Sequence, residues 1–272
     1  LLVEWNDTAV DYPREKTIHQ LFEEQVEKTP HNTAIVYEET SLSYQALNKR
    51  ANQLARLLIK SGVKVETMVP LCLDRSLEMI IAILAVLKTG GAYVPIDPDL
   101  PLKRKEHIIK DTKARLVLSH SALEAGLPSS VTKVICVDEM EDYAQLQNSN
   151  LDTKMTSRNL AYVIYTSGTT GKPKGVMIEA FSLINLCFSF FEIYEIREND
   201  RFSQMANYAF DVFGCELWPA LLCGAQVSLV ANNKIMSIDL LIQWLNDNLI
   251  TVLDCSSSLS EILFQYKQHL HF

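Results

Sequence analysis

The feature that most constrains the fold is a repeated alternation of helical stretches and short apolar runs. A serine opens a predicted helix at residues 43–60, and an apolar run, Val69–Leu73, follows it. A second serine opens a predicted helix at residues 76–88, which two glycines end before the short apolar run 92–94. Serine caps, glycine stops and buried strands in this order are typical of α/β units. The alternation therefore predicts α/β layers with largely parallel strands.

The same alternation continues to the end of the sequence. We predict five more helices and five more strands. The helices are expected near Leu102–Lys110, Phe181–Tyr194, Val212–Leu222, Ile238–Asn248 and Leu259–His269, and the strands at Arg115–Ser119, Val134–Val137, Leu160–Tyr165, Val227–Val230 and Thr251–Leu253. A polar connector near residues 141–158 divides the series. We therefore expect one α/β half at 17–150 and another at 151–272, packed as one body.

Composition excludes several classes of protein. The 272 residues are 48% hydrophobic and 21% charged, as in an ordinary globular protein. The net charge of −8 argues against a nucleic-acid partner, and the cluster Lys103–Lys105 is interpreted as a solvated helix face. The longest apolar runs are too short to span a bilayer. Six scattered cysteines without metal spacing indicate a reducing compartment, so we expect a cytoplasmic protein without a membrane or metal site.

The stretch Leu160–Val176, LAYVIYTSGTTGKPKGV, carries the strongest chemical signal. A predicted strand leads into a loop of small, hydroxyl-bearing residues, and Lys172 and Lys174 follow. Glycines let such a loop turn its N–H groups and hydroxyls around phosphate oxygens, and lysine neutralises their charge. The spacing is not that of a Walker A loop. A surface turn rich in glycine, threonine and lysine is the alternative interpretation.

This stretch closely resembles the phosphate loop of the adenylate-forming superfamily. Four further segments resemble the adenylation domains of nonribosomal peptide synthetases within it: Leu1–Pro30, LSYQALNKRANQLARLL from Leu42, LKTGGAYVPIDPDLP from Leu87 and FDVFGCELWPALLCGA from Phe210. The resemblance implies layered αβαβα-type sheets flanked by helices, the N-terminal part of the adenylate-forming enzyme fold. It also implies that residues 1–16 are a linker from a preceding domain.

In that family a carboxylate attacks the α-phosphate of ATP and gives an acyl-adenylate and pyrophosphate. The resemblance implies that seven residues hold the leaving phosphates: Thr166, Ser167, Gly168, Thr169, Thr170, Gly171 and Lys174. Mg²⁺ normally accompanies the ATP, because it binds phosphate oxygens with few protein ligands. We identify no catalytic residue in these 272 residues and no protein metal cluster.

Asp211 is the main candidate for substrate binding. In amino-acid-activating relatives, the aspartate of this motif meets the α-ammonium group of the substrate. The alternative is an N-cap on the helix that begins at Val212, and the two roles are compatible. Val212, Cys215 and Asp254 fall at positions that line the substrate pocket in the family, where Asp254 would favour a polar or basic substrate side chain. Helix packing for Val212 and Cys215, and strand termination for Asp254, are the alternatives.

The resemblance also has departures and absences. Ala180 stands where the family commonly has histidine, and Phe213 where many relatives have serine. Relatives continue with the adenine and ribose motifs and a mobile C-terminal subdomain that carries the catalytic lysine. We therefore expect the N-terminal part of an amino-acid-activating domain, truncated at its C-terminus and inactive alone. Its partners would be the amino acid, the missing C-terminal subdomain and a downstream carrier domain bearing phosphopantetheine.

Two other functions remain open at this point. The first is a fragment of an acyl- or aryl-CoA ligase, against which Asp211 argues. The second is a non-catalytic or split-enzyme nucleotide-binding module. Glu216 and Trp218, in the same motif as Asp211, are interpreted as packing and surface positions of an amphipathic helix. The histidines, His107 among them, show no grouping of nucleophile and base.

Overall fold

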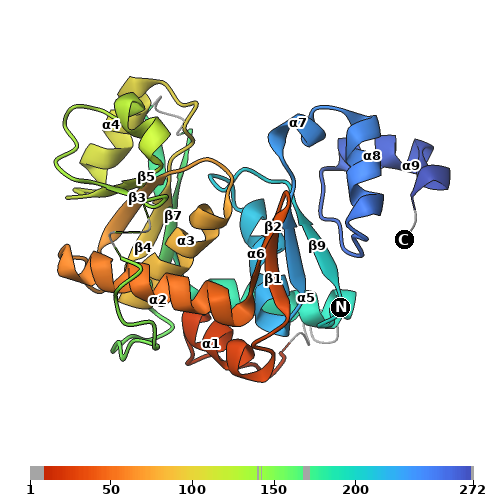
Figure 1. Cartoon of the computed structure of the whole chain (residues 1–272), viewed down its shortest axis with the longest axis horizontal. Helices are drawn as coiled ribbons and strands as arrows, with labels where there is room; N and C mark the ends of the chain where they lie inside the picture. Colours follow the sequence, from red (N-terminus) through yellow and green to blue (C-terminus); the bar gives the residue numbers. More distant parts are fainter. Residues whose placement is uncertain (1–8, 140, 142, 168–171, 271–272) are drawn as a thin grey trace, which may run out of the picture.

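A computed structural model describes residues 9–139, 141, 143–167 and 172–270 (Figure 1). The helices are α1 Ile18–Lys28, α2 Tyr44–Lys60, α3 Leu77–Thr89, α4 Leu102–Asp111, α5 Ala180–Tyr194, α6 Val212–Cys223, α7 Asn232–Ile235, α8 Ile238–Asp247 and α9 Ser257–Gln265. The strands are β1 Thr33–Tyr37, β2 Thr40–Ser43, β3 Met68–Cys72, β4 Ala92–Pro95, β5 Val117–Ser119, β6 Val134–Cys136, β7 Leu160–Thr166, β8 Lys174–Glu179, β9 Arg201–Gln204 and β10 Gln226–Leu229.

The strands form two sheets. The six-stranded sheet has the order β6-β5-β3-β4-β7-β8, and the four-stranded sheet has the order β2-β1-β10-β9. Each is parallel except for one antiparallel pair at its edge, β7 with β8 and β1 with β2. The expectation of largely parallel strands is confirmed. Each sheet takes strands from both sides of residue 150, so the ranges 17–150 and 151–272 interleave in both sheets.

Two apolar helices lie against the sheets. Helix α3 contacts β4 of the six-stranded sheet and β1 of the four-stranded sheet, and nearly all of its residues are buried. Helix α6 contacts β9 and β10 and packs against α5. Helices α1 and α2 pack beside α3 (Figure 1). A continuous apolar core joins these elements, as expected for helices that are hydrophobic on all sides. The two sheets flanked by helices confirm the predicted fold class.

Local sequence signals account for the ends of these helices. The Ser43 hydroxyl accepts from the N–H of Ala46 at 3.2 Å, and the Ser76 hydroxyl from that of Met79 at 3.0 Å. Gly90 ends α3 with a φ of 87°, in the left-handed region that glycine adopts without steric cost. The predicted helices 43–60 and 76–88 are therefore confirmed within a residue of their ends.

Other local predictions were wrong. Thr251–Leu253 forms only an isolated bridge between Val252 and Phe202, not a strand of either sheet. The last predicted helix ends at Gln265, and a 3₁₀ turn, Lys267–His269, follows it. Strands β1, β2, β8 and β9 were not predicted.

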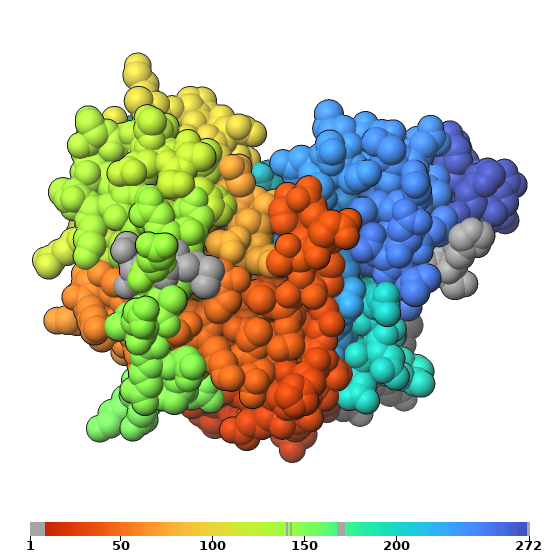
Figure 2. All heavy atoms as spheres, in the orientation of Figure 1, coloured from red at the N-terminus to blue at the C-terminus, as the bar shows by residue number. Residues whose placement is uncertain are grey.

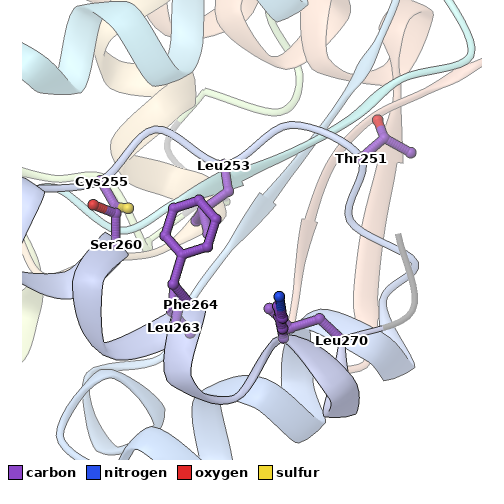
Figure 3. A pocket seen from close by; sticks show the side chains of 8 residues that line it. Thr251, Leu253, Cys255, Ser260, Leu263, Phe264 and Leu270 are labelled. Atoms are coloured by element: carbon purple, nitrogen blue, oxygen red, sulfur yellow. The ribbon is translucent and has the colours of Figure 1, made fainter.

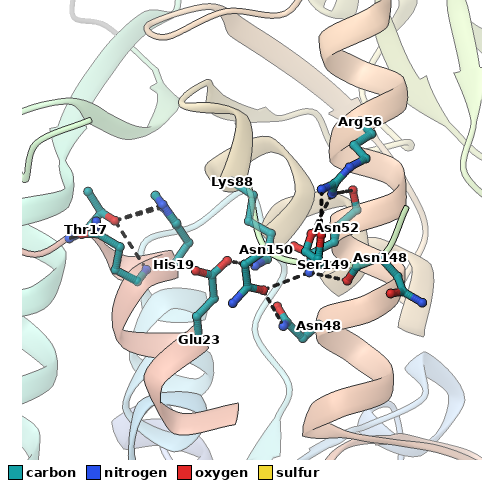
Figure 4. A network of polar contacts seen from close by, with 11 residues as sticks. Thr17, His19, Glu23, Asn48, Asn52, Arg56, Lys88, Asn148, Ser149 and Asn150 are labelled. Atoms are coloured by element: carbon teal, nitrogen blue, oxygen red, sulfur yellow. Dashed lines mark hydrogen bonds and ion pairs between the residues drawn. The ribbon is translucent and has the colours of Figure 1, made fainter. Parts of the chain in front are cut away.

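A polar network joins α1, α2, α3 and the predicted connector (Figure 4). The side-chain amides of Asn48 and Asn52 on α2 both donate to the side-chain oxygen of Asn150, at 2.8 and 3.0 Å. The Lys88 ammonium on α3 is fully buried and pairs with the Glu23 carboxylate on α1. The connector is therefore fixed to α2 by partly buried hydrogen bonds, and α3 to α1 by a buried ion pair, and such buried polar groups are costly to leave unsatisfied.

The C-terminal helices form a smaller part of the molecule with its own apolar cluster. Leu241, Ile242 and Leu245 of α8 pack there with Leu263 of α9. Beside the cluster lies a cavity of about 530 Å³ in which Phe264 and Leu253 face each other (Figure 3). Space-filling atoms show the surface hollowed between this blue part and the yellow-green part that contains α4 (Figure 2). No described helix is long and apolar enough to cross a membrane.

Candidate functional site

The described phosphate-loop candidates lie at the facing ends of strands β7 and β8. Strand β7 ends at Thr166, which pairs across the hairpin with Lys174, the first residue of β8. The Lys174 side chain is exposed. Gly168, Thr169, Thr170 and Gly171 lie outside the described residues. The described part of the loop thus consists of Thr166 and Ser167 on one side and residues 172–173 on the other.

A cavity of about 700 Å³ opens at the end of β7. Strands β4 and β7 are parallel neighbours, so their carboxyl ends and the residues that follow meet at one edge of the sheet. Ligands bind at this edge in many α/β proteins. The polar side chains that line the cavity are Asp97, Arg104, Tyr162, Tyr165, Thr166, Ser167 and Asp211.

Asp211 lines the cavity from the N-cap position of α6. Its predicted position as the N-cap is confirmed, and one of its carboxylate oxygens accepts from the N–H of the adjacent Val212 at 3.0 Å. The residue is exposed, and its neighbour Phe210, 63% exposed, also lines the cavity. A carboxylate at this position can receive a cationic group while it also caps the helix.

Three other pocket candidates are not among the residues that line this cavity. Val212 is 43% exposed, whereas Cys215 and Asp254 are half-buried. Burial, together with the charges of Asp254 and Asp211, raises the pKa of the Cys215 thiol to about 11. Burial also raises the pKa of Asp254. The Cys215 thiol therefore lies within electrostatic range of both carboxylates and is protonated near neutral pH.

The segment that leads to Asp211 is held by a buried clamp formed by Arg75 and Glu216. One carboxylate oxygen of Glu216 accepts from the backbone N–H groups of Met205 and Ala206, at 3.1 and 2.9 Å. It also accepts from the Gln204 side-chain amide at 2.8 Å. The Arg75 guanidinium donates to the carbonyl oxygens of residues 204, 205 and 206, at 2.8, 2.6 and 3.1 Å. The clamp thus provides hydrogen-bond partners for backbone N–H groups and for carbonyl oxygens of residues 204–206.

Glu216 was not recognised from the sequence as a buried residue. It is only 1% exposed, and burial raises the pKa of its carboxyl to about 7 despite its three hydrogen bonds and the nearby Arg75. A glutamate on an otherwise apolar helix is the signal that could have suggested a buried polar role. Trp218 is fully buried, as the packing interpretation predicted.

Two further side chains fix the same segment to the six-stranded sheet and to the loop after β4. The Tyr208 hydroxyl lies within donating distance of the carbonyls of Leu71 and Ile96, at 2.8 and 2.9 Å, and accepts from the N–H of Leu73 at 2.9 Å. The Asn207 amide donates to the Asp97 carboxylate at 2.7 Å. The chain is therefore fixed over residues 204–208, immediately before the exposed Asp211.

The site has polar groups suited to a nucleotide but no protein metal cluster in its described part. Thr166 and Ser167 line the cavity, where their hydroxyls can donate to phosphate oxygens. Among the described residues, no three His, Cys, Asp or Glu side chains converge to hold a metal ion.

Comparison with known proteins identifies the family of this chain. The family model for AMP-binding enzymes matches residues 22–271. Bacitracin synthase 1 from Bacillus licheniformis is 44% identical over 252 residues, which cover 93% of this chain and 5% of that protein. Gramicidin S synthase 1 from Brevibacillus brevis is 42% identical over 249 residues, which cover 91% of this chain and 23% of that protein. The chain belongs to the AMP-binding enzyme family, and it spans less than a quarter of these relatives.

A solved structure shares the fold over nearly the whole chain. The nonribosomal peptide synthetase FmoA3, in a form bound to α-methyl-L-serine-AMP, superposes with a TM-score of 0.89 at 26% identity and covers 98% of this chain and 30% of that chain. The N-terminal subdomain of Klebsiella oxytoca NpsA superposes at 0.82 over 95% of this chain and 66% of that chain. At 23% identity, NpsA supports the fold alone. The resemblance to the N-terminal part of these adenylation domains is confirmed.

Proposed function

We propose that this chain is the N-terminal part of an amino-acid-activating adenylation domain. The reaction converts an amino acid and ATP to aminoacyl-AMP and pyrophosphate, and the aminoacyl group then passes to the thiol of a carrier protein. The observation that carries this proposal is the cavity itself. It places Thr166 and Ser167, at the end of β7, in the same space as the Asp211 carboxylate.

The chemistry of the cavity suits both substrates. Backbone amides, hydroxyls and the Lys174 ammonium would hold the β- and γ-phosphates and spread their developing charge, which lowers the barrier to departure of pyrophosphate. The predicted residues 168–171 belong to this role. Mg²⁺ bound to the phosphates would neutralise further negative charge. The Asp211 carboxylate would receive the α-ammonium, and a charged hydrogen bond of this kind contributes about 1.5–3 kcal/mol.

The remaining predicted residues would shape the amino-acid pocket. Val212 and Cys215 would contact the substrate side chain, and Asp254 would favour a polar or basic one. We further propose that residues 1–16 form a linker and that further chain beyond residue 272 completes the active site. The 272 residues alone would then be inactive. The product would be loaded onto the phosphopantetheine of a carrier domain.

Amino-acid-dependent ATP–pyrophosphate exchange tests the proposal in the protein at its natural length. The informative variant is Asp211→Asn, because asparagine caps a helix as well as aspartate does but carries no charge. We expect the KM for the amino acid to rise about ten- to a hundredfold, as the loss of one charged hydrogen bond requires. Asp239→Asn, in the exposed first turn of α8, is the matched control and should leave the exchange unchanged.

The outcomes separate the alternatives. Exchange that depends on a fatty or aryl acid, and not on any amino acid, would identify an acyl- or aryl-acid ligase. Absence of exchange with every carboxylic acid would favour a non-catalytic module. Restored exchange on mixing the 272-residue chain with the rest of the protein would show that the chain contributes a working half-site.

A further inference from the structure

One face of α4 is attached to the hairpin that carries the phosphate-loop candidates. Arg104, His107, Ile108 and Asp111 are spaced three and four residues apart, so their side chains share this face. The Tyr165 hydroxyl on β7 donates to the Asp111 carboxylate at 2.6 Å. The Nε2 atom of His107 lies 3.2 Å from the carbonyl oxygen of Pro173, and it donates to that oxygen in the tautomer that carries a hydrogen on Nε2. Helix α4 therefore holds the hairpin both before and after residues 168–171.

Arg104 and Ile108, on the same face, line the 700 Å³ cavity. Arg104 is half-buried, and its guanidinium has no ion pair or hydrogen bond with any described residue. Arg75, by contrast, donates from both terminal nitrogens of its guanidinium to the carbonyl oxygens of residues 204–206. A partly desolvated guanidinium is stabilised by an oxyanion, because its N–H groups can donate in pairs to carboxylate or phosphate oxygens.

A phosphate-bearing ligand in this cavity would need a positively charged side chain beside it. Two carboxylates, Asp97 and Asp211, line it, and they would repel a phosphate-bearing ligand. Among its described lining residues, Arg104 is the one side chain with a permanent positive charge. The prediction that Lys103–Lys105 form a solvated face is wrong for Lys105. Of the three residues only Lys103 is exposed, and Lys105 is buried with its ammonium donating to the Gly126 carbonyl at 3.3 Å.

We propose that Arg104 binds a phosphate group of the nucleotide in this cavity. The inference deepens the proposed function and rests on it, since a nucleotide must occupy the cavity. Phosphate is favoured over a substrate carboxylate for one reason. The helix that presents Arg104 is attached to the phosphate-loop hairpin on both sides, so the guanidinium and the loop hydroxyls keep a fixed relation to each other. The Arg104 guanidinium would donate paired N–H groups to the phosphate, and the hydroxyls of Thr166 and Ser167 would act as neutral donors.

The test is a comparison of nucleotide binding by the wild-type protein, at its natural length, and two variants. Arg104→Gln removes the guanidinium, and Lys103→Gln removes a neighbouring positive charge that does not line the cavity. ATP, AMP and adenosine are titrated into each protein. We expect Arg104→Gln to weaken ATP binding about ten- to a hundredfold, the effect of losing a charged hydrogen bond, while adenosine binding stays within about twofold. Lys103→Gln should bind all three ligands as the wild type does.

The three ligands also locate the contact. An equal loss for AMP and ATP assigns Arg104 to the α-phosphate, and a loss for ATP alone assigns it to the β- or γ-phosphate; both support the inference. Partial recovery in Arg104→Lys would further support a charge-based contact. Unchanged ATP binding in Arg104→Gln, or an equal loss for adenosine, would overturn it. If the wild-type protein binds no nucleotide, the proposed function fails as well, which distinguishes that failure from a wrong assignment of Arg104.

Discussion

Replacing Glu216 by glutamine should change how the stability of this chain depends on pH. The carboxylate is 1% exposed and accepts three hydrogen bonds through one oxygen, at 3.1, 2.9 and 2.8 Å. Glutamine has the same shape and can place its carbonyl oxygen where that oxygen lies. The substitution therefore removes the ionisation of the side chain and keeps the acceptor.

The direction and size of the effect follow from the pKa of Glu216. Burial raises it from 4.5 to about 7, so the folded state keeps a proton that the unfolded state loses between pH 4.5 and 7. Stability from this group is therefore present below pH 4.5 and is lost as the pH rises to about 7. One pKa unit corresponds to about 1.4 kcal/mol, which gives a total of about 3 kcal/mol. The free energy of unfolding of Glu216→Gln, relative to that of the wild type, should therefore rise by about 3 kcal/mol between pH 4.5 and 7.

The wild-type profile alone would hide this effect because His19 acts in the opposite direction. Burial and the nearby Lys88 lower the pKa of His19 from 6.5 to about 3. Its contribution to stability is present above pH 6.5 and is lost as the pH falls towards 3. The two groups partly cancel between pH 4.5 and 6.5. The quantity to measure is therefore the difference between variant and wild type.

Urea unfolding at several pH values from 5 to 8 measures this difference. We expect the free energies of unfolding of Glu216→Gln and wild type to agree within about 1 kcal/mol at pH 5, because the neutral acid and the amide are similar. The variant should become progressively more stable than wild type towards pH 7–8. Glu261→Gln, at an exposed position on α9, is the control and should give a flat difference. A flat difference for Glu216→Gln would refute the raised pKa and show that the hydrogen bonds offset the effect of burial.

Three further predictions concern other parts of the molecule. Lys174→Gln should raise the KM for ATP in pyrophosphate exchange at least about tenfold, and the exposed neighbour Lys172→Gln should raise it less; equal effects would contradict the role given to Lys174. Asp254→Asn should shift amino-acid preference away from basic side chains, measured by exchange across a panel of amino acids, and an unchanged preference order would exclude it from the pocket. Glu23→Gln should lower the free energy of unfolding at pH 6 by about 3 kcal/mol, because it leaves the buried Lys88 ammonium unpaired. Burial lowers the pKa of Lys88 to about 8, so the ammonium loses its proton as the pH rises and this loss should shrink between pH 6 and 8; a loss that does not change with pH would show that the ion pair is not its cause.

Elements with strong local signals were predicted well. Helices α2 and α3 have a serine cap, an apolar stripe or core and a glycine beyond the end, and these signals act within a few residues. Strand β9, RFSQ, has no comparable signal. Its Ser203 and Gln204 are buried because the neighbouring elements cover them, and local sequence does not encode that covering. The wrong strand at 251–253 shows the same limit, since only Val252 found a partner.

The sequence by itself determined the alternating α/β architecture, the family resemblance and the candidates Thr166, Ser167 and Asp211, because their motifs are contiguous. Only the tertiary structure decided which residues from distant segments share a space. It brought Arg104 and Asp97 into the cavity with Asp211, and it buried Glu216 against the backbone of residues 205–206. The physical reason is that burial and charge pairing depend on which elements pack together, and packing joins segments that lie far apart in the chain.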